Sequence, residues 1–251
     1  NPSPNLQGYN IYRANTVYGF NFGAPYRSVG VGVTEFIDTG TGVGDPNNYY
    51  YIVRAYDTKG NEEQNRNIVG KFIITLYPKN NEVSIPFELK YTKSSIVFSQ
   101  INGLFNIIEA YDALTGMWKT WDGSGGLLTD VDHKMGLRIK MKASSPITDF
   151  VTVGRVPGMT EIEMYHELTS SYWNFVGFPR HLNTPLPQAL DNYGMMGKYD
   201  IVLWYDPLDK KAHWKWFDPN DPNGSPLQEL RPGMGIWVHT TQGGTWSLPG
   251  S

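Results

Sequence analysis

The chain has 251 residues, of which 40% are apolar, 18% charged and 14% aromatic, with 27 Gly, 17 Pro and no Cys. The absence of Cys excludes disulfide scaffolds, thiol catalysis and Cys-ligated metal sites. The 21 Lys and Arg residues against 24 Asp and Glu leave a net charge of −3, without the basic stripe that a nucleic-acid binder needs. We therefore expect neither a nucleic-acid partner nor a cofactor. No stretch approaches the about 18 apolar residues of a membrane span.

The N-terminal third predicts a meander of antiparallel strands. Residues Asn1-Pro2-Ser3-Pro4 lack the charged and apolar regions of a secretion signal, so we expect a mature or excised segment. Runs rich in β-branched and aromatic residues follow, separated by Gly, Asn and Asp clusters typical of turns. The expected strands include Tyr9–Tyr12, Thr34–Asp38 and Tyr49–Tyr56.

Residues 5–77 resemble the second half of a fibronectin type III module. The resemblance is carried by Gly8–Arg13, Phe36–Asp38, Tyr50–Asp57 and Gly60–Glu62, which match that family's strands C, E and F with the turn into G. It implies a sandwich, spanning residues 1–79, that lacks its first two strands. Since strand E would then have an unpaired edge, we expect polypeptide from outside residues 1–79 to contact Phe36 and Ile37. A retained upstream peptide, a second copy of the chain and the following module are the alternatives.

The remainder contains an internal repeat, which predicts two copies of one small β-module over residues 80–162 and 163–251. Pro86 and Pro179, Tyr111 and Tyr205, and Gly136 and Gly235 are expected at corresponding positions. Each copy also has a segment that favours one or two helical turns, Ser94–Asn102 and Pro185–Tyr193. Four pairs of blocks recur in the same order: Val83–Leu89 with Val176–Leu182, Ile107–Leu114 with Ile201–Leu208, Trp118–Asp122 with Trp214–Asp218, and Met135–Ile139 with Met234–Val238.

The second copy resembles a tandem module of secreted archaeal and bacterial surface proteins and secreted peptidases. That module reads W-N-L-V-G-F-P, then T-P and A-L, V-W-x-Y-D, W-x-x-Y and L-x-P-G-x-G-Y-W. The first copy departs from this pattern, because Asp132–Gly136 replaces the Pro-Gly turn. The resemblance implies an accessory or adhesive role without a defined reaction. The matching segments are Trp173–Pro179, Thr184-Pro185, Ala189-Leu190, Val202–Asp206, Trp214 with Phe217, and Leu230–Trp237.

Catalytic motifs are incomplete. His166-Glu167 begins like a zinc-protease helix, but Ser170 stands where a second His is required. Gly123-Ser124-Gly125 is preceded by Asp122, where a nucleophile elbow needs Gly. The five His residues form no pair spaced to bind one metal ion, so no metal site is expected. A dispersed triad remains open, because such residues meet only in the fold.

A loop rich in Asp, Asn and Pro has a partial resemblance to a calcium site. Asp218–Gly224 supplies oxygen ligands, but Pro222 occupies the fifth position, where an EF-hand loop needs another. We interpret this segment as a solvated turn between strands.

The tryptophans of the two predicted hairpins are the remaining candidates for a binding site. Trp118, Trp121, Trp214 and Trp216 lie in corresponding strands, and alternation places Trp214 and Trp216 on one face. Exposed indoles would form a platform for stacking sugar rings. The alternative, which we favour, is that these residues fill the interior of a small module, since each buries about 150–250 Å².

The sequence thus predicts an all-β, non-catalytic segment of a larger secreted or cell-surface protein, acting in spacing, adhesion or domain packing. Its partners would be other domains of that protein, a retained upstream peptide, or a polysaccharide or other cell-surface component. A carbohydrate-binding accessory region of a secreted enzyme is the second hypothesis, and a secreted hydrolase with an unrecognised site is the third. Exposure of the hairpin tryptophans separates the first two.

Overall fold

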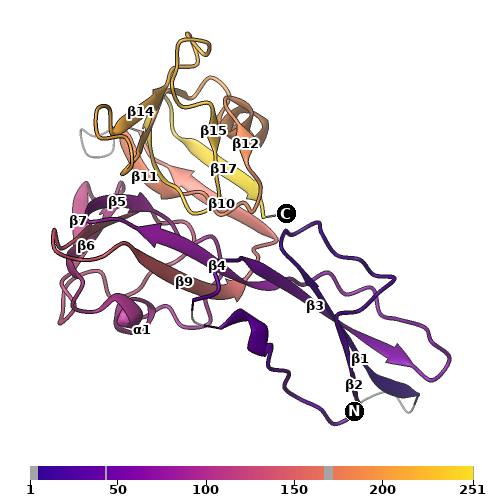
Figure 1. Cartoon of the computed structure of the whole chain (residues 1–251). Helices are drawn as coiled ribbons and strands as arrows, with labels where there is room; N and C mark the ends of the chain where they lie inside the picture. The colour runs from indigo at the N-terminus through magenta and orange to yellow at the C-terminus, as the bar shows by residue number, and fades with distance from the viewer. Residues whose placement is uncertain (1–4, 43, 167–171, 251) are drawn as a thin grey trace.

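The computed structural model describes residues 5–42, 44–166 and 172–250. It is 44% strand and 8% helical, which confirms the prediction of an all-β fold with short helical segments. In Figure 1 the C-terminal part of the chain lies above, the middle part below it, and the N-terminal sheet extends to the lower right. Residues 1–4, and Glu167 and Ser170 of the incomplete zinc-protease motif, lie outside the described residues.

An antiparallel sheet of five strands contains the N-terminal meander. Alternation along these strands turns Tyr12, Tyr50, Ile52 and Ile74 into the core, which explains why the segments fold as strands. In the order β2-β1-β3-β4-β9, the strands are β2 (Arg27–Gly30), β1 (Leu6–Ala14), β3 (Tyr49–Asp57), β4 (Val69–Leu76) and β9 (Thr148–Arg155).

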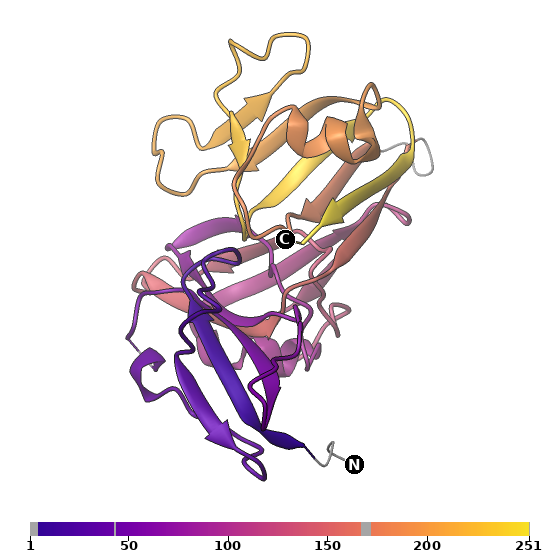
Figure 2. The same ribbon diagram turned by 90° about the vertical axis from the view of Figure 1, so that its right-hand side faces the viewer.

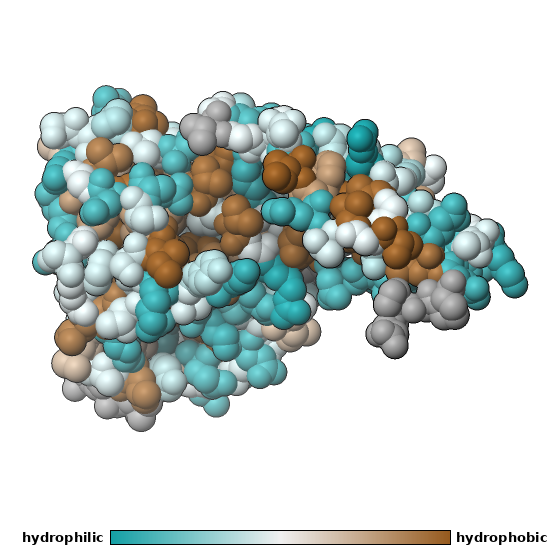
Figure 3. Space-filling view, turned by 90° about the horizontal axis from the view of Figure 1, so that it is seen from below, coloured by the Kyte–Doolittle hydropathy of each residue, from teal (hydrophilic) through white to brown (hydrophobic). Residues whose placement is uncertain are grey.

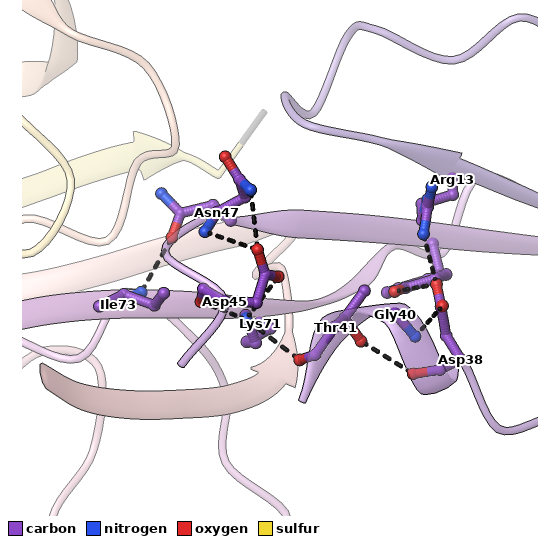
Figure 4. Close-up of polar contacts among 10 residues, drawn as sticks. Arg13, Asp38, Gly40, Thr41, Asp45, Asn47, Lys71 and Ile73 are labelled. Atoms are coloured by element: carbon purple, nitrogen blue, oxygen red, sulfur yellow. Dashed lines mark hydrogen bonds and ion pairs between the residues drawn. The ribbon is translucent and has the colours of Figure 1, made fainter. Parts of the chain in front are cut away.

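The strand expected at Thr34–Asp38 is not formed. This segment is irregular and leads into a short helical turn, η1 (Thr39–Thr41). Asp38 anchors it by accepting hydrogen bonds from Arg13 at 2.8 Å and from the Tyr51 hydroxyl at 2.8 Å. Further along, Lys71 donates to Thr41 O and forms an ion pair with Asp45 (Figure 4).

The premise of an outside contact across Phe36 and Ile37, a strand at Thr34–Asp38 with an unpaired edge, is therefore wrong, and a contact from a retained peptide or a second copy of the chain stays a prediction. Phe36 packs edge-on against Tyr26, and Ile37 is 71% exposed. A strand needs a hydrogen-bonded neighbour, and in the described ranges no strand lies beside this segment, so side-chain bonds hold it instead. Polypeptide from beyond residue 79 does extend this sheet, but at β4, which pairs with β9 from Val69↔Arg155 to Leu76↔Thr148.

Two four-stranded antiparallel sheets follow, and their strands come in the same order along the chain. We call residues 69–155 the first unit and residues 159–249 the second unit. In the first unit the order is β5 (Lys79–Val83), β8 (Leu137–Met141), β6 (Phe105–Asp112) and β7 (Met117–Trp121). In the second it is β11 (Trp173–Gly177), β16 (Gly235–Thr240), β13 (Tyr199–Tyr205) and β14 (Trp214–Phe217).

The registers of the two sheets also correspond. Tyr111 pairs with Trp118 in the first unit, and Tyr205 pairs with Trp214 in the second. A register shift occurs between β6 and β8 at Phe105/Ile107, and the related strands β13 and β16 have one at Tyr199/Ile201. Of the positions predicted to correspond, Tyr111 lies in β6 and Tyr205 in β13, Gly136 directly precedes β8 while Gly235 begins β16, and Pro86 and Pro179 both lie outside strands.

A buried Asn has the same role in each unit. Asn81 accepts the backbone N–H of Tyr77 and donates to its carbonyl, both at 2.8 Å. Asn174 does the same for Tyr165, at 2.8 and 3.0 Å. Both side chains are buried on the core side of their sheets, where an amide without hydrogen-bond partners would lower the stability of the fold.

A strand pair and short helical segments complete each unit. β4 pairs with β9, and β10 (Met159–Met164) pairs with β17 (Gly244–Pro249). In Figure 2 the helical turns of the second unit lie over its strands, and there Trp246 Nε1 donates to Ala189 O at 2.9 Å. The remaining elements are α1 (Ser94–Val97), η2 (Ser99–Ile101), β12 (Thr184–Pro185), α2 (Gln188–Leu190), η3 (Asp191–Met195) and β15 (Glu229–Leu230).

Hydrogen-bonded strands cross both of the domain boundaries drawn from the sequence. The boundary at residues 79 and 80 falls at the start of β5, yet β4 is bonded to β3 on one side and to β9 on the other. The boundary at residues 162 and 163 falls inside β10, which is bonded to β17 over its whole length. The N-terminal sheet and the first unit therefore share β4 and β9.

Candidate functional site

The two tryptophans of the first hairpin lie on opposite faces of β7. Trp121 packs against the core of the first unit. Trp118 faces the second unit, with its ring centroid 6.2 Å from that of Phe175 and 5.6 Å from that of Trp237. They are three positions apart in sequence, and alternation along a strand sends such positions to opposite faces.

The two tryptophans of the second hairpin share one face of β14, as predicted. Trp214 is 44% exposed and Trp216 is 37% exposed, so the expectation that they fill the module interior is wrong. Phe217, next along the strand, points the other way and is fully buried. The structure therefore brings Trp214 and Trp216 together at the surface, and it places Trp118 and Trp121 elsewhere.

A charged pair lies at the centre of the contact between the two units. Glu82 of β5 accepts two hydrogen bonds from Arg138 of β8, at 2.9 and 2.7 Å. Its other oxygen accepts the indole N–H of Trp237, in β16, at 3.0 Å. The Glu82 side chain is only 1% exposed and that of Arg138 is 22% exposed. We call Glu82, Arg138, Trp118, Phe175 and Trp237 the central joint.

Burial governs the electrostatics of the central joint. Desolvation raises the pKa of Glu82 above its ordinary value, and the Arg138 guanidinium and the Trp237 indole partly offset that rise. The Arg138 guanidinium also lies over the Trp118 ring, 4.6 Å from its centroid. Sequence reasoning missed this joint. Its only signal was a pair of charged residues at strand positions where the second unit has Phe175 and Trp237.

Backbone contacts between the units are reciprocal. Ser84 N–H donates to Gly233 O at 2.7 Å, and Gly177 N–H, at the corresponding place in the second unit, donates to Lys134 O at 2.8 Å. Isolated bridges join Val83 to Met234 and Met135 to Val176. Each unit thus presents the same two segments to the other, as the halves of an isologous dimer do.

Gly136 and Gly235, which follow Met135 and Met234, lie in the contact between the two units. A Cβ on Gly235 would lie 2.4 Å from Val83 O, and one on Gly136 would lie 2.6 Å from the Phe175 ring. Only glycine lets the two backbones approach so closely.

Gly235→Ala should therefore lower the free energy of unfolding by about 1–3 kcal/mol, because the new methyl group must push β5 away from β16. Urea denaturation measures this change. Gly158→Ala is the matched control, since a Cβ there meets nothing within 4 Å, and we expect a change within about 0.5 kcal/mol. Equal stabilities of the two variants would contradict the close approach.

Two clefts flank the contact at corresponding places and differ in chemistry. One, of about 230 Å³, lies between β4 and β5 of the first unit and the start of the second hairpin. The other, of about 350 Å³, lies between β10 and β11 of the second unit and the first hairpin. The first is lined mainly by apolar side chains, including Phe72, Ile74, Val83, Trp204, Leu208 and Met234. The second carries charged side chains, Asp112, Lys119, Asp132, Lys134, Glu161 and Glu163.

His181 connects all three parts of the chain. Its Nε2 is 2.8 Å from Pro86 O in the first unit, and its Nδ1 is 2.9 Å from the Tyr50 hydroxyl in the N-terminal sheet. A carbonyl can only accept, so Nε2 carries the proton and Nδ1 accepts from Tyr50. The ring is buried against Phe87, and desolvation lowers the pKa of His181 to about 4.

Apolar side chains also reach the surface of the N-terminal sheet. Val69 and Val153 are exposed on β4 and β9, and they line a cleft of about 380 Å³ with Glu88, Leu89 and Lys90. Seen from below, brown apolar residues form a broken band interrupted by teal polar ones (Figure 3). Scattered apolar exposure of this kind is common on protein surfaces, and we assign no site to it.

The polar groups considered for catalysis or metal binding have structural partners. His213 Nδ1 is 3.0 Å from Asp206 O, and His239 Nδ1 is 2.5 Å from Asp200. Asp218 and Asp221 accept backbone N–H groups of their own turn. Over residues 5–42, 44–166 and 172–250, no group of three or more His, Asp or Glu side chains is placed to hold a metal ion.

Comparison of the chain with models of known protein families, with characterised proteins and with solved structures gave no match. Among the helices of the described residues, none is long and apolar enough to cross a membrane.

Proposed function

We propose that this chain is a non-catalytic, extracellular or cell-surface segment of a larger protein, which holds neighbouring domains at a fixed separation. Reciprocal backbone bonding between the units, Ser84 to Gly233 and Gly177 to Lys134, carries the proposal. A flexible linker would not need close contacts that bury charge and glycine backbone. We further propose that the two units are tandem copies of one module, because their strand order and register correspond.

The spacer proposal also accounts for the way in which the N-terminal sheet is attached to the two units. β4 belongs both to that sheet and to the first unit, and His181 of the second unit bonds to Tyr50 of β3. Bending at either boundary would break a strand pairing or a buried hydrogen bond. A spacer function requires this resistance to bending, and we propose a fibronectin type III relationship only for the N-terminal sheet.

An activity screen tests the absence of catalysis. With peptide, ester and glycoside substrates we expect no turnover above buffer. His213 bonds to the Asp206 carbonyl of its own turn and His239 to Asp200, and among the described residues neither ring has a hydroxyl partner. Turnover that is abolished by His213→Ala would instead support the hypothesis of a secreted hydrolase.

A second candidate function is a carbohydrate-binding accessory region of a secreted enzyme. One observation favours it: Trp214 and Trp216 are exposed side by side on the outward face of β14. Burying an indole stabilises a fold, so two exposed indoles on one strand are available for a ligand.

A further inference from the structure

The outward face of β14 differs from the corresponding face of β7 in its cover and in its second aromatic residue, because Thr120 stands on β7 where β14 has Trp216. Trp118 on β7 is covered by Phe175, Trp237 and the Arg138 guanidinium. Trp214 holds the corresponding register position, opposite Tyr205, which it contacts edge-on at 5.5 Å. Trp214 is 44% exposed, and among the described residues neither it nor Trp216 makes a ring or cation–π contact with the first unit.

The two tryptophans project from one face of a strand at the end of its sheet. In the described part of the chain β14 is the last strand in the order β11-β16-β13-β14, and along its outer edge Leu227 N–H donates to Trp216 O at 3.0 Å, so a ligand would contact the face that carries the indoles and not the strand edge. Trp214 and Trp216 are two residues apart, which separates their Cα atoms by roughly 6.6 Å along the strand. A chain of ring-shaped units lying along β14 would meet one indole after the other.

The exposed area and the neighbouring charges decide which ligand fits. The two half-exposed indoles offer on the order of 200 Å², far below the roughly 800 Å² per partner of a stable protein interface. Lys215, between the two tryptophans, forms an ion pair with Asp209, and Asp206 accepts the N–H of Leu208. Within β14 itself the aromatic surface has little unpaired charge, while Lys210 and Lys211 of the preceding turn are exposed and form no ion pair within the described ranges. The indole surface suits a ligand with an apolar ring face and uncharged hydroxyl groups.

We infer that Trp214 and Trp216 form a stacking platform for a neutral polysaccharide. This inference rests on the second candidate function above and names its ligand class and its two contact residues. It does not depend on the spacer proposal.

Retention of the whole chain on insoluble polysaccharides tests the inference. The panel contains the neutral polysaccharides cellulose, chitin, xylan and mannan, and the acidic polysaccharide alginate as a gel. We expect retention on at least one neutral member, and we expect the double variant Trp214→Ala/Trp216→Ala to weaken it at least tenfold. Circular dichroism should show the double variant folded, because both side chains are exposed. Should it be unfolded, Trp216→Gln alone is the replacement, with a loss of at least threefold expected.

Trp118→Ala is the matched control. It removes the tryptophan at the corresponding register position, which is covered by the second unit, so it should lower thermal stability and leave retention unchanged below its melting temperature. Undiminished retention of the double variant would overturn the platform while leaving carbohydrate binding elsewhere intact. Absence of retention on every member of the panel would overturn the inference and the second candidate function. Retention on alginate alone would overturn the neutral ligand class while leaving carbohydrate binding intact. None of these results bears on the activity screen.

Discussion

Replacing Arg138 with methionine should lower the free energy of unfolding by about 3–5 kcal/mol, because it leaves the buried Glu82 carboxylate without its counter-charge. The Trp237 indole N–H would remain as a partner of that carboxylate, but a neutral donor cannot compensate for a lost guanidinium. Denaturant unfolding at pH 7 measures the change.

Two further variants identify the cause of that loss. Lys140→Met removes a half-exposed cation two residues along β8 that pairs with Glu109. Glu109 keeps the Arg138 guanidinium as a partner at 4.0 Å, so we expect a loss of at most about 1 kcal/mol. Glu82→Gln in the Arg138→Met background removes the stranded charge and should restore part of the stability, since an amide oxygen still accepts from Trp237. If the double variant is no more stable than Arg138→Met, the cost comes from lost packing on Trp118 instead of buried charge.

Acidification should destabilise the protein through His181. Its pKa is about 4 in the folded chain and about 6.5 when exposed, so the unfolded chain binds the proton more readily. The contribution is therefore fully present above pH 6.5 and is lost as the pH falls to 4, by about 3 kcal/mol. Protonation would also place a donor on Nδ1 against the Tyr50 hydroxyl.

Denaturant midpoints between pH 7 and pH 4 measure this dependence. His181→Gln should be less stable at pH 7, because one amide cannot replace both ring contacts, and its stability should fall less steeply with acid. Burial also lowers the pKa of His133. Denaturant midpoints of His133→Gln over the same pH range therefore show how much of the loss of stability in acid comes from His133. A His181→Gln curve parallel to that of the wild type would contradict the assignment to His181.

The local elements could be predicted from the sequence where one short segment contains the whole signal. Tyr49–Asp57 alternates, is bounded by turn residues and folds as β3. The segment 94–102 contains α1 and η2, and the segment 185–193 contains α2 and the start of η3, which continues to Met195. The same reasoning failed at Thr34–Asp38. Its residues favour a strand, but the decision depends on whether a neighbour can pair with it, which local pattern does not contain.

Only part of the candidate site could be predicted from the sequence, because alternation assigns a side chain to one face of a strand but does not show what covers that face. Period-two alternation correctly placed Trp214 and Trp216 on one face, and it also implies that Trp118 and Trp121 lie on opposite faces of β7. Which face meets solvent depends on how the two units pack, since Trp118 and Trp214 have corresponding positions and different surroundings. The central joint joins Glu82, Arg138 and Trp237 across long sequence separations, and no motif of adjacent residues records it.

The central claim is that the N-terminal sheet and the two units resist bending because they unfold as one body. Native-state hydrogen exchange at increasing denaturant tests it most directly, by following backbone amides in β3, β8 and β16. We predict that all three strands open with the same free energy and the same denaturant dependence, and that Arg138→Met lowers all three together. If β3 or either unit opens independently at lower free energy while the others stay protected, the parts are separate domains and the account of a fixed spacer is contradicted.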